Sequence, residues 1–248
     1  MYHLKAFLRN PGLYLAGIYF TLFKKVFAKN GITIHVPFQL TDVPFRGRFM
    51  QNKYEKEEAT HLSQYISPND SVLELGSCLG YVSCLTNKLL QNKEQHVVVE
   101  ANPNLIPWIE KNREENNCLF KIEHCIISLE KKNEFYIHEL IVGGSTKRKT
   151  AHKIAVEGTT FSALEKKYAM GFNTLIMDIE GGELDLFRKH RDEIGKFQKI
   201  FYEVHPFANI LTIEEALECE KILTDLGFNL LLRDGNFQVW EKNDNGAS

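Results

Sequence analysis

The sequence predicts an α/β protein with a doubly wound, mostly parallel sheet, a terminal antiparallel hairpin and an N-terminal helical extension. Three observations predict this class. Short apolar runs alternate with segments of helical spacing from residue 72 to residue 226, which is typical of a parallel sheet covered by helices. The run Val97–Val99 is apolar at every position, as expected for a strand buried on both faces. Asp234-Gly235 separates the last two predicted strands and is a hairpin-turn signal.

The elements follow in order along the chain. Residues 32–38 alternate weakly and predict an edge strand, residues 57–65 have helical spacing, and Pro68 with its polar neighbours predicts a turn. The predicted strands are 72–75, 96–100, 120–128, 134–142 (a strand or hairpin arm), 173–178, 199–204, 228–232 and 237–241, with a short extended segment at 154–156. The predicted helices are 81–90, 104–116, 162–170, 183–190 and 212–226. Pro103 favours the start of the second helix, and Gly227 stands where the last helix should stop.

Composition limits the range of functions. The chain has 248 residues, 44% of them hydrophobic, which is enough for one large domain with a buried core. A formal net charge of -2 provides no global field for nucleic acid, so we expect no nucleic-acid partner. The five cysteines are odd in number and lack C-x-x-C spacing. This pattern argues against a zinc site or a disulfide framework, and it favours a reducing, cytoplasmic location.

Residues 1–50 differ from the predicted main domain, residues 51–248. No acid occurs before Asp42, and the apolar run 13–23 is too short to span a bilayer. One interpretation is an interfacial helix within residues 1–30, peripheral to the membrane, whose lysines meet anionic lipid. The other is a helix packed on its own domain or on a second subunit of a homo-oligomer, and we slightly favour this packed helix.

A glycine-containing turn follows the strand 72–75. Gly76 and Gly80 stand four residues apart, where backbone can approach a ligand closely and the next helix presents free N–H groups. Open α/β sheets bind ligands at this end of a strand. The first glycine of the dinucleotide pattern G-x-G-x-x-G is missing, and Glu74 would repel a pyrophosphate but suit a sulfonium. The turn therefore favours S-adenosylmethionine.

The next predicted strand ends in Glu100. An acid at this position accepts hydrogen bonds from ribose hydroxyls in several cofactor-binding folds. Glu100 therefore indicates a ribose, without choosing between S-adenosylmethionine and a nicotinamide cofactor.

Two further strand ends carry polar pairs. Strand alternation places Asp178 with Glu180, and Glu203 with His205, so we expect the four side chains to converge at one edge of the sheet. Carboxylates beside an imidazole permit general-base catalysis on a hydroxyl, or binding of a divalent metal. We predict these four residues as catalytic and leave the metal open. The favoured role of Glu183 is that of a helix-start acid, and the basic loop 143–149 could meet an anionic substrate or be a solvated surface loop.

These motifs together resemble the FkbM-type methyltransferases. The resemblance rests on four segments: 74–83, 99–103, 178–183 and 203–206. It implies a seven-stranded Rossmann-like methyltransferase sheet and S-adenosylmethionine-dependent O-methylation of a sugar, a glycoconjugate or a related small molecule. The predicted cofactor residues are Glu74, Gly76, Ser77, Gly80, Tyr81, Glu100, Ala101, Asn102 and Asp178. One departure is the sequence Thr160-Phe161-Ser162, where the family usually has Thr-Leu-Asp.

Two alternatives remain open. A nicotinamide-dependent oxidoreductase would share Glu100 but should have a third glycine in the first turn. A catalytically inactive binding subunit would keep the fold, although the intact polar cluster argues against it.

Overall fold

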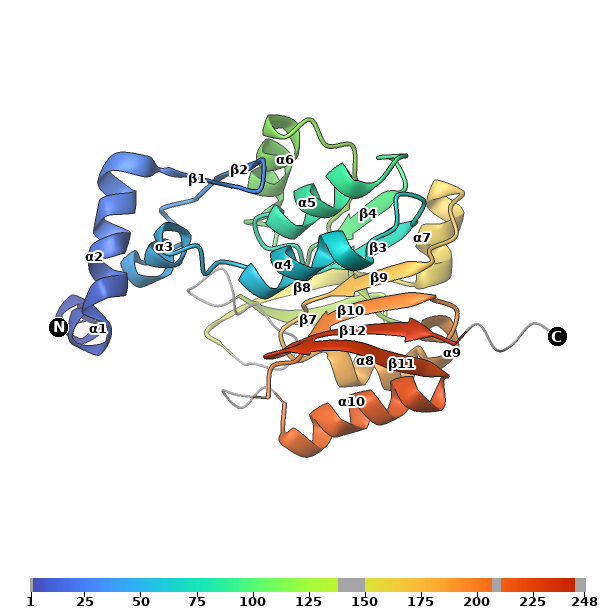
Figure 1. Ribbon diagram of the computed structural model, residues 1–248. Coiled ribbons are helices and arrows are strands. Elements are labelled where there is room, and N and C mark those ends of the chain that lie inside the picture. Colours follow the sequence, from blue (N-terminus) through green and yellow to red (C-terminus); the bar gives the residue numbers. More distant parts are fainter. Residues whose placement is uncertain (1, 138–149, 207–210, 244–248) are drawn as a thin grey trace.

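The computed structural model describes residues 2–137, 150–206 and 211–243. Its centre is a seven-stranded sheet with strand order β11-β12-β10-β9-β3-β4-β5 (Figure 1). The strands are β3 (Val72–Leu75), β4 (His96–Val99), β5 (Lys121–Glu123), β9 (Thr174–Met177), β10 (Lys199–Glu203), β11 (Phe228–Asp234) and β12 (Phe237–Lys242). Strands β10, β9, β3, β4 and β5 are parallel, and β12 is antiparallel to both of its neighbours. The mostly parallel sheet with a terminal hairpin is therefore confirmed.

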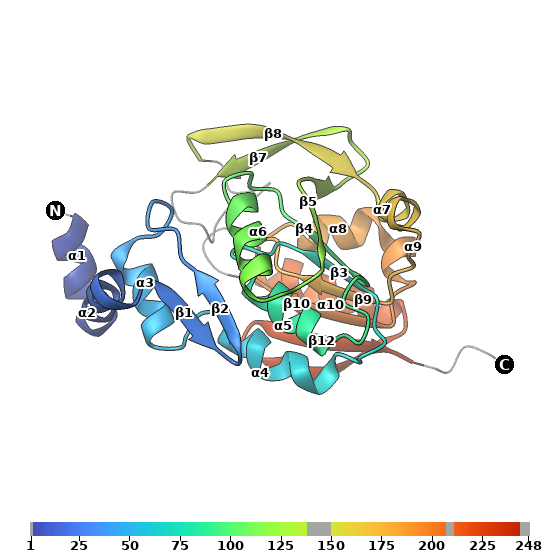
Figure 2. The ribbon, with the colours of Figure 1, turned by 90° about the horizontal axis from the view of Figure 1, so that it is seen from above.

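Helices cover both faces of this sheet (Figures 1 and 2). On one face lie α7 (Phe161–Tyr168), α8 (Glu183–Lys189), α9 (Arg191–Ile194) and α10 (Ile213–Asp225). On the other lie α4 (Lys56–Tyr65), α5 (Tyr81–Leu89) and α6 (Ile106–Glu115). Side chains of β3 point alternately to the two faces of the sheet. Leu73 and Leu75 belong to the core beneath α7, α8, α9 and α10, and Val72 belongs to a core on the opposite face. Both faces of the parallel strands are thus buried, which explains their continuous apolar runs.

The predicted strand 120–128 is wrong as a single strand. The chain leaves the main sheet after β5, and β6 (Ile126–Ile127) joins a separate three-stranded sheet with β7 (Lys132–Ile137) and β8 (His152–Thr159). Strand β8 is longer than the expected segment 154–156 because it pairs with β7 over six positions. Part of the predicted strand 134–142 and the basic loop 143–149 lie outside the described residues.

The N-terminal extension is helical, as predicted, but contains more than helices. It comprises α1 (Tyr2–Arg9), α2 (Pro11–Tyr19), the π-helical turn η1 (Phe20–Lys24), the hairpin β1 (Val26–Lys29) with β2 (Ile32–His35), and α3 (Val43–Met50). The edge-strand prediction for 32–38 is confirmed over β2, which pairs with β1 alone, in a two-stranded sheet separate from the main one. Helix α3 was not predicted. It starts where the Asp42 carboxylate accepts a hydrogen bond from the N–H of Phe45 at 2.7 Å.

Side chains of the main domain hold the extension. Asn116 at the C-cap of α6 accepts a hydrogen bond from the backbone N–H of Thr33, and Asn112 in α6 accepts one from that of His35, both at 2.8 Å. The ring of Phe27 packs against that of Tyr81 in α5 with centroids 5.2 Å apart. The domain boundary at residue 50 stays a prediction. Among the described residues, none of the helices is both long and apolar enough to cross a bilayer.

Candidate active site

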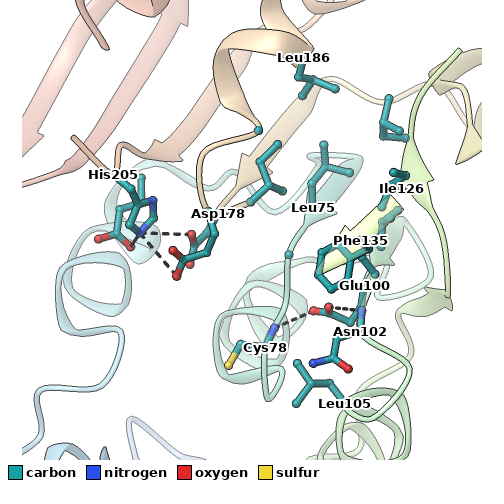
Figure 3. A pocket seen from close by; sticks show the side chains of 18 of the residues that line it. Leu75, Cys78, Glu100, Asn102, Leu105, Ile126, Phe135, Asp178, Leu186 and His205 are labelled. Carbon is teal, nitrogen blue, oxygen red and sulfur yellow. Dashed lines mark hydrogen bonds and ion pairs between the residues drawn. The ribbon is translucent and has the colours of Figure 1, made fainter. Parts of the chain in front are cut away.

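A cavity of about 600 Å³ lies at the carboxyl ends of β3, β4, β9 and β10, beside the small sheet. Its walls include Leu75 and Val99 at the ends of the two central strands, Asp178 just beyond β9, and Glu203 at the end of β10. The volume is within the range typical of small-molecule and cofactor sites. Figure 3 shows two groups of side chains in this cavity, one around Glu100 and one around His205.

The turn after β3 forms the floor between these groups. Gly76 has a φ of +81°, and a Cβ there would lie 1.8 Å from the carbonyl oxygen of Asp178. Only glycine tolerates both this conformation and this approach. Gly80 has a φ of +76° and is the N-cap of α5. The first predicted glycine is therefore required by backbone packing at the cavity itself.

Hydrogen bonds to the Glu100 carboxylate connect this turn to the end of β4. One carboxylate oxygen, Oε2, accepts hydrogen bonds from the N–H groups of Ser77 and Cys78, both at 3.1 Å, and Oε1 accepts one from Asn102 at 2.8 Å. Burial raises the pKa of Glu100, against these three bonds, which favour the charged form. A carboxylate offers about four lone-pair positions, so Oε1 retains capacity for a ligand hydroxyl. Ala101 and Asn102 also line the cavity.

An apolar wall faces Glu100. It is formed by Leu105 at the start of α6, Ile126 and Ile127 of β6, and Phe135 of β7 (Figure 3). These residues carry no signal in the sequence, because no local pattern shows that the small sheet folds back over the cavity. Such a wall can contact the flat face of an aromatic base.

The structure brings Asp178, Glu180, Glu203 and His205 together at the other end of the cavity. The Nε2 atom of His205 lies 3.7 Å from Oδ1 of Asp178, 3.9 Å from Oε1 of Glu180 and 3.8 Å from Oε2 of Glu203. Its Nδ1 atom lies 3.9 Å from Oε1 of Glu183, which is fully buried. One imidazole is thus surrounded by four carboxylates.

Two further acids line the cavity that were not predicted from the sequence: Glu55 at the N-cap of α4 and Glu58 within α4. Glu58 lies on α4, is 8% exposed, lines the cavity and has one carboxylate oxygen, Oε2, without a hydrogen-bond partner. Its carboxyl faces that of Glu203. In the sequence Glu58 looks like an ordinary polar position on an amphipathic helix, and only the packing of α4 turns it inward.

Burial and neighbouring charges shift the pKa values of the residues in this acidic cluster. Burial raises the pKa of Asp178 to about 8 and that of Glu203 to about 7, with further contributions from neighbouring carboxylates. Burial raises the pKa of Glu58 to about 8. For His205, burial lowers the pKa, but Glu183 and the other surrounding carboxylates outweigh it and raise the pKa to about 10. At neutral pH the imidazole is therefore protonated, and the nearby carboxyls share protons.

Three of these residues could also hold a metal ion. Asp178, Glu203 and His205 each offer one ligand atom, and the three atoms lie within 4.8 Å of one another. Two carboxylates and an imidazole are a donor set that several divalent cations accept.

The structure places Glu74 away from the cavity, contrary to the expectation from sequence. Its side chain points toward α5, where it accepts a hydrogen bond from the Ser83 hydroxyl at 2.5 Å and lies 3.0 Å from Nε2 of His96. Glu74 is fully buried. Its position one residue before the strand end turns it toward the helix layer, so the structure assigns it a packing role.

Three other predicted cofactor residues do not line this cavity. Ser77 supplies its backbone N–H to Glu100, and Gly80 starts α5. Tyr81 is fully buried among aromatic rings, and its hydroxyl accepts a hydrogen bond from Asn30. These three residues support the conformation of the turn but do not contact the cavity.

Comparison with solved structures gives weak overall similarity to several methyltransferases. An O-methyltransferase from Bacillus cereus, in complex with SAH, has a TM-score of 0.48 and 10% identity over 75% of this chain and 81% of that chain. A precorrin-6y C5,15-methyltransferase from Geobacter metallireducens has a TM-score of 0.47 and 12% identity, covering 75% and 88%. A ribosomal protein L11 methylase from Lactobacillus delbrueckii subsp. bulgaricus has a TM-score of 0.46 and 13% identity, covering 77% and 80%. No curated protein matches the sequence.

The family comparison is decisive. Residues 74–230, more than half of the chain, match the methyltransferase FkbM domain. This segment begins in β3 and ends in β11, so it contains Gly76, Glu100 and the whole segment from Asp178 to His205. The match favours the methyltransferase interpretation over the nicotinamide-dependent alternative. The chain belongs to the FkbM methyltransferase family and is an S-adenosylmethionine-dependent methyltransferase.

Proposed function

We propose that the protein is an O-methyltransferase that acts on a hydroxyl of a sugar, a glycoconjugate or a related small molecule. The observation that carries this proposal is the convergence of Asp178, Glu180, Glu203 and His205 at one end of the cavity that Glu100 and the glycine turn form at the other. A cofactor and an acceptor hydroxyl could meet between the two groups.

The residues present fit S-adenosylmethionine. The apolar wall of Leu105, Ile126 and Phe135 suits the adenine base, and the free acceptor position on Glu100 suits a ribose hydroxyl. The acidic end of the cavity suits a positive charge. When bound, the cofactor supplies a sulfonium methyl group for transfer.

Asp178 is the better general base of the cluster. His205 keeps its proton until its pKa of about 10, whereas Asp178 ionises near its pKa of about 8, so the fraction of Asp178 able to act as a base grows as the pH rises above neutrality. A carboxylate oxygen of Asp178 therefore accepts the proton of the acceptor hydroxyl. His205, held between Asp178 and Glu203, keeps the carboxylates oriented and offsets their charge.

Positioning contributes more than proton removal. A general base typically accelerates a reaction by about 10²–10⁴-fold, whereas holding two reactants in line can lower a barrier by roughly 7–11 kcal/mol. The glycine turn and the acidic cluster share a rigid backbone contact at Gly76 and Asp178, which suits such positioning.

A divalent cation held by Asp178, Glu203 and His205 is the second candidate for organising the acceptor, favoured by the closeness of their ligand atoms. These three residues would hold the cation, which would supply Lewis-acid activation of a hydroxyl. Chelation distinguishes the two possibilities.

The experiment that tests the function is methyl transfer from labelled S-adenosylmethionine to a pool of glycans, glycolipids and sugar metabolites from cells that lack the protein. We expect label in products that survive mild alkali, because methyl ethers are stable there and methyl esters are not. The matched control is Asp178→Asn. Binding of S-adenosylhomocysteine without any transfer would favour an inactive binding subunit, and alkali-labile label would indicate carboxyl methylation.

We also propose that the protein is located in the cytoplasm. All five cysteines are free, which fits a reducing compartment.

A further inference from the structure

The N-terminal helical segment carries an exposed apolar stripe. Five side chains at helical spacing on α2 and η1 are between 37% and 69% exposed: Leu15, Ile18, Tyr19, Leu22 and Phe23. The spacing of three and four residues puts them on one side of the helix. Leu8 of α1 is also exposed. A contiguous exposed apolar surface of this kind marks an interaction site.

The opposite side of the same helix is fixed to the protein. A Cβ on Gly17 in α2 would lie 1.8 Å from the carbonyl oxygen of Val43, and a Cβ on Gly47 in α3 would lie 2.0 Å from that of Leu13. Phe20 is buried and stacks on Phe49 with ring centroids 5.5 Å apart. Two glycines in reciprocal contact thus dock α2 on α3, and the apolar stripe points outward because the inner side is used.

Cations stand at both ends of the stripe. Lys5 and Arg9 precede it, Lys24 and Lys25 follow it directly, and all four are exposed. The first 41 residues contain no Asp or Glu. An apolar helix side with basic residues at its ends and aromatic side chains within it is typical of a helix that lies in the headgroup region of a membrane.

The segment also projects from the main domain. Figure 1 shows α1 and α2 at one end of the molecule, apart from the helices that cover the sheet, and Figure 2 shows the same from above. Helix α3, on which α2 is docked, carries Arg48, which lines the cavity. One short helix therefore contacts α2 and contributes to the cavity wall.

We propose that the side of α2 and η1 formed by Leu15, Ile18, Tyr19, Leu22 and Phe23 binds the surface of a membrane that contains anionic lipids. A second copy of the chain is less suited, because a two-fold contact through this side would bring the basic ends of two segments together. Membrane binding by this segment is independent of the reaction proposed above.

The test is flotation of the full chain with vesicles of phosphatidylserine in phosphatidylcholine. We expect the wild-type protein to float, and Leu22→Ser with Phe23→Ser to weaken its partitioning by about tenfold or more, since two large apolar side chains no longer enter the bilayer. Lys24→Gln should weaken it by about fivefold on the anionic vesicles and hardly at all on pure phosphatidylcholine. The matched control is Ile213→Ser with Leu217→Ser, two exposed apolar residues of α10.

Three outcomes would overturn the inference. The wild-type protein could fail to float with anionic vesicles. The α10 control could weaken binding as much as the double variant at Leu22 and Phe23. Light scattering could show a dimer that this η1 variant converts to a monomer, which would identify a second copy as the occupant. Circular dichroism and S-adenosylhomocysteine binding verify that each variant is folded, as expected for substitutions of exposed side chains.

Discussion

A side-chain carbon on Gly76 would lie 1.8 Å from the backbone carbonyl oxygen of Asp178, so the turn after β3 and the acid after β9 are in direct backbone contact. One residue earlier, the carbonyl oxygen of Leu75 accepts a hydrogen bond from the N–H of Asp178 at 2.9 Å. The placement of the proposed base therefore depends on residue 76 having no side chain. This contact joins the cofactor end of the cavity to its acidic end.

We expect Gly76→Ala to destabilise the protein and to weaken cofactor binding. The left-handed conformation alone costs a residue with a side chain about 1–3 kcal/mol, and the clash with Asp178 adds to this. Thermal unfolding and calorimetry with S-adenosylhomocysteine measure the two effects. Gly171→Ala is the matched control, because a Cβ at Gly171 would meet no atom within 4 Å. A variant at Gly76 with normal melting temperature and affinity would show that the contact is dispensable.

Glu74→Gln should reduce stability and leave cofactor affinity unchanged. Glu74 accepts a hydrogen bond from Ser83 and lies beside His96 in the buried layer under α5. A disturbed buried hydrogen bond typically costs about 1–3 kcal/mol, which urea unfolding can measure. The control is Glu94→Gln, whose exposed partner Lys121 lies 3.8 Å away and whose pairing is worth about 1 kcal/mol or less. A loss of affinity without a loss of stability would restore the cofactor role that the sequence suggested.

The strand-end residues could be predicted from the sequence for a physical reason. Parallel strands carry their carboxyl ends to the same edge of a sheet, so acids at the ends of several apolar runs meet whatever the loops do. Glu100, Asp178, Glu203 and His205 were found this way. Glu74 was misplaced by the same reasoning, because it precedes the end of its strand and alternation turns it into the helix layer.

The remaining site residues depend on packing that leaves no local signal. Glu58 reaches the cluster only because α4 lies against the end of β10, and Phe135 lines the cavity only because the chain leaves the main sheet after β5. Helix α3 was missed too: its Pro44 lies in the first turn, and its Gly47 is required by the contact with α2. The placement of these residues depends on tertiary packing, which the local sequence does not reveal.

Asp178→Asn should lower kcat by about 10²–10⁴-fold, the usual contribution of a general base, while S-adenosylhomocysteine affinity changes little. Asparagine keeps the size of the side chain and removes its ability to take a proton. Asp192→Asn, at an exposed position of α9, is the matched control. Loss of kcat together with a large fall in melting temperature would instead identify Asp178 as a structural residue.

The pH dependence of kcat should show a rise near pH 7–8. The pKa of Asp178 is raised to about 8 and that of Glu203 to about 7, chiefly by burial. The base must be ionised, so activity is low below these pKa values and increases as pH rises through them. It should fall again near pH 10, where His205 loses its proton. Because the groups interact, the profile reports the cluster as a whole. A rise near pH 4, the value of an ordinary carboxyl, would contradict this account.

Removal of divalent metals should leave methyl transfer intact. A metal ion binds the imidazole of His205 only after its proton has left, and the surrounding carboxylates hold that proton until about pH 10. We therefore expect dialysis against EDTA to change kcat little at neutral pH, and added Mg²⁺ or Mn²⁺ to have no large effect. Glu203→Gln provides the comparison, because it alters the cluster whether or not a metal binds. Complete loss of activity in EDTA, with recovery on adding one of the two ions, would identify Asp178, Glu203 and His205 as the residues that hold a metal and would contradict the role of Asp178 as general base.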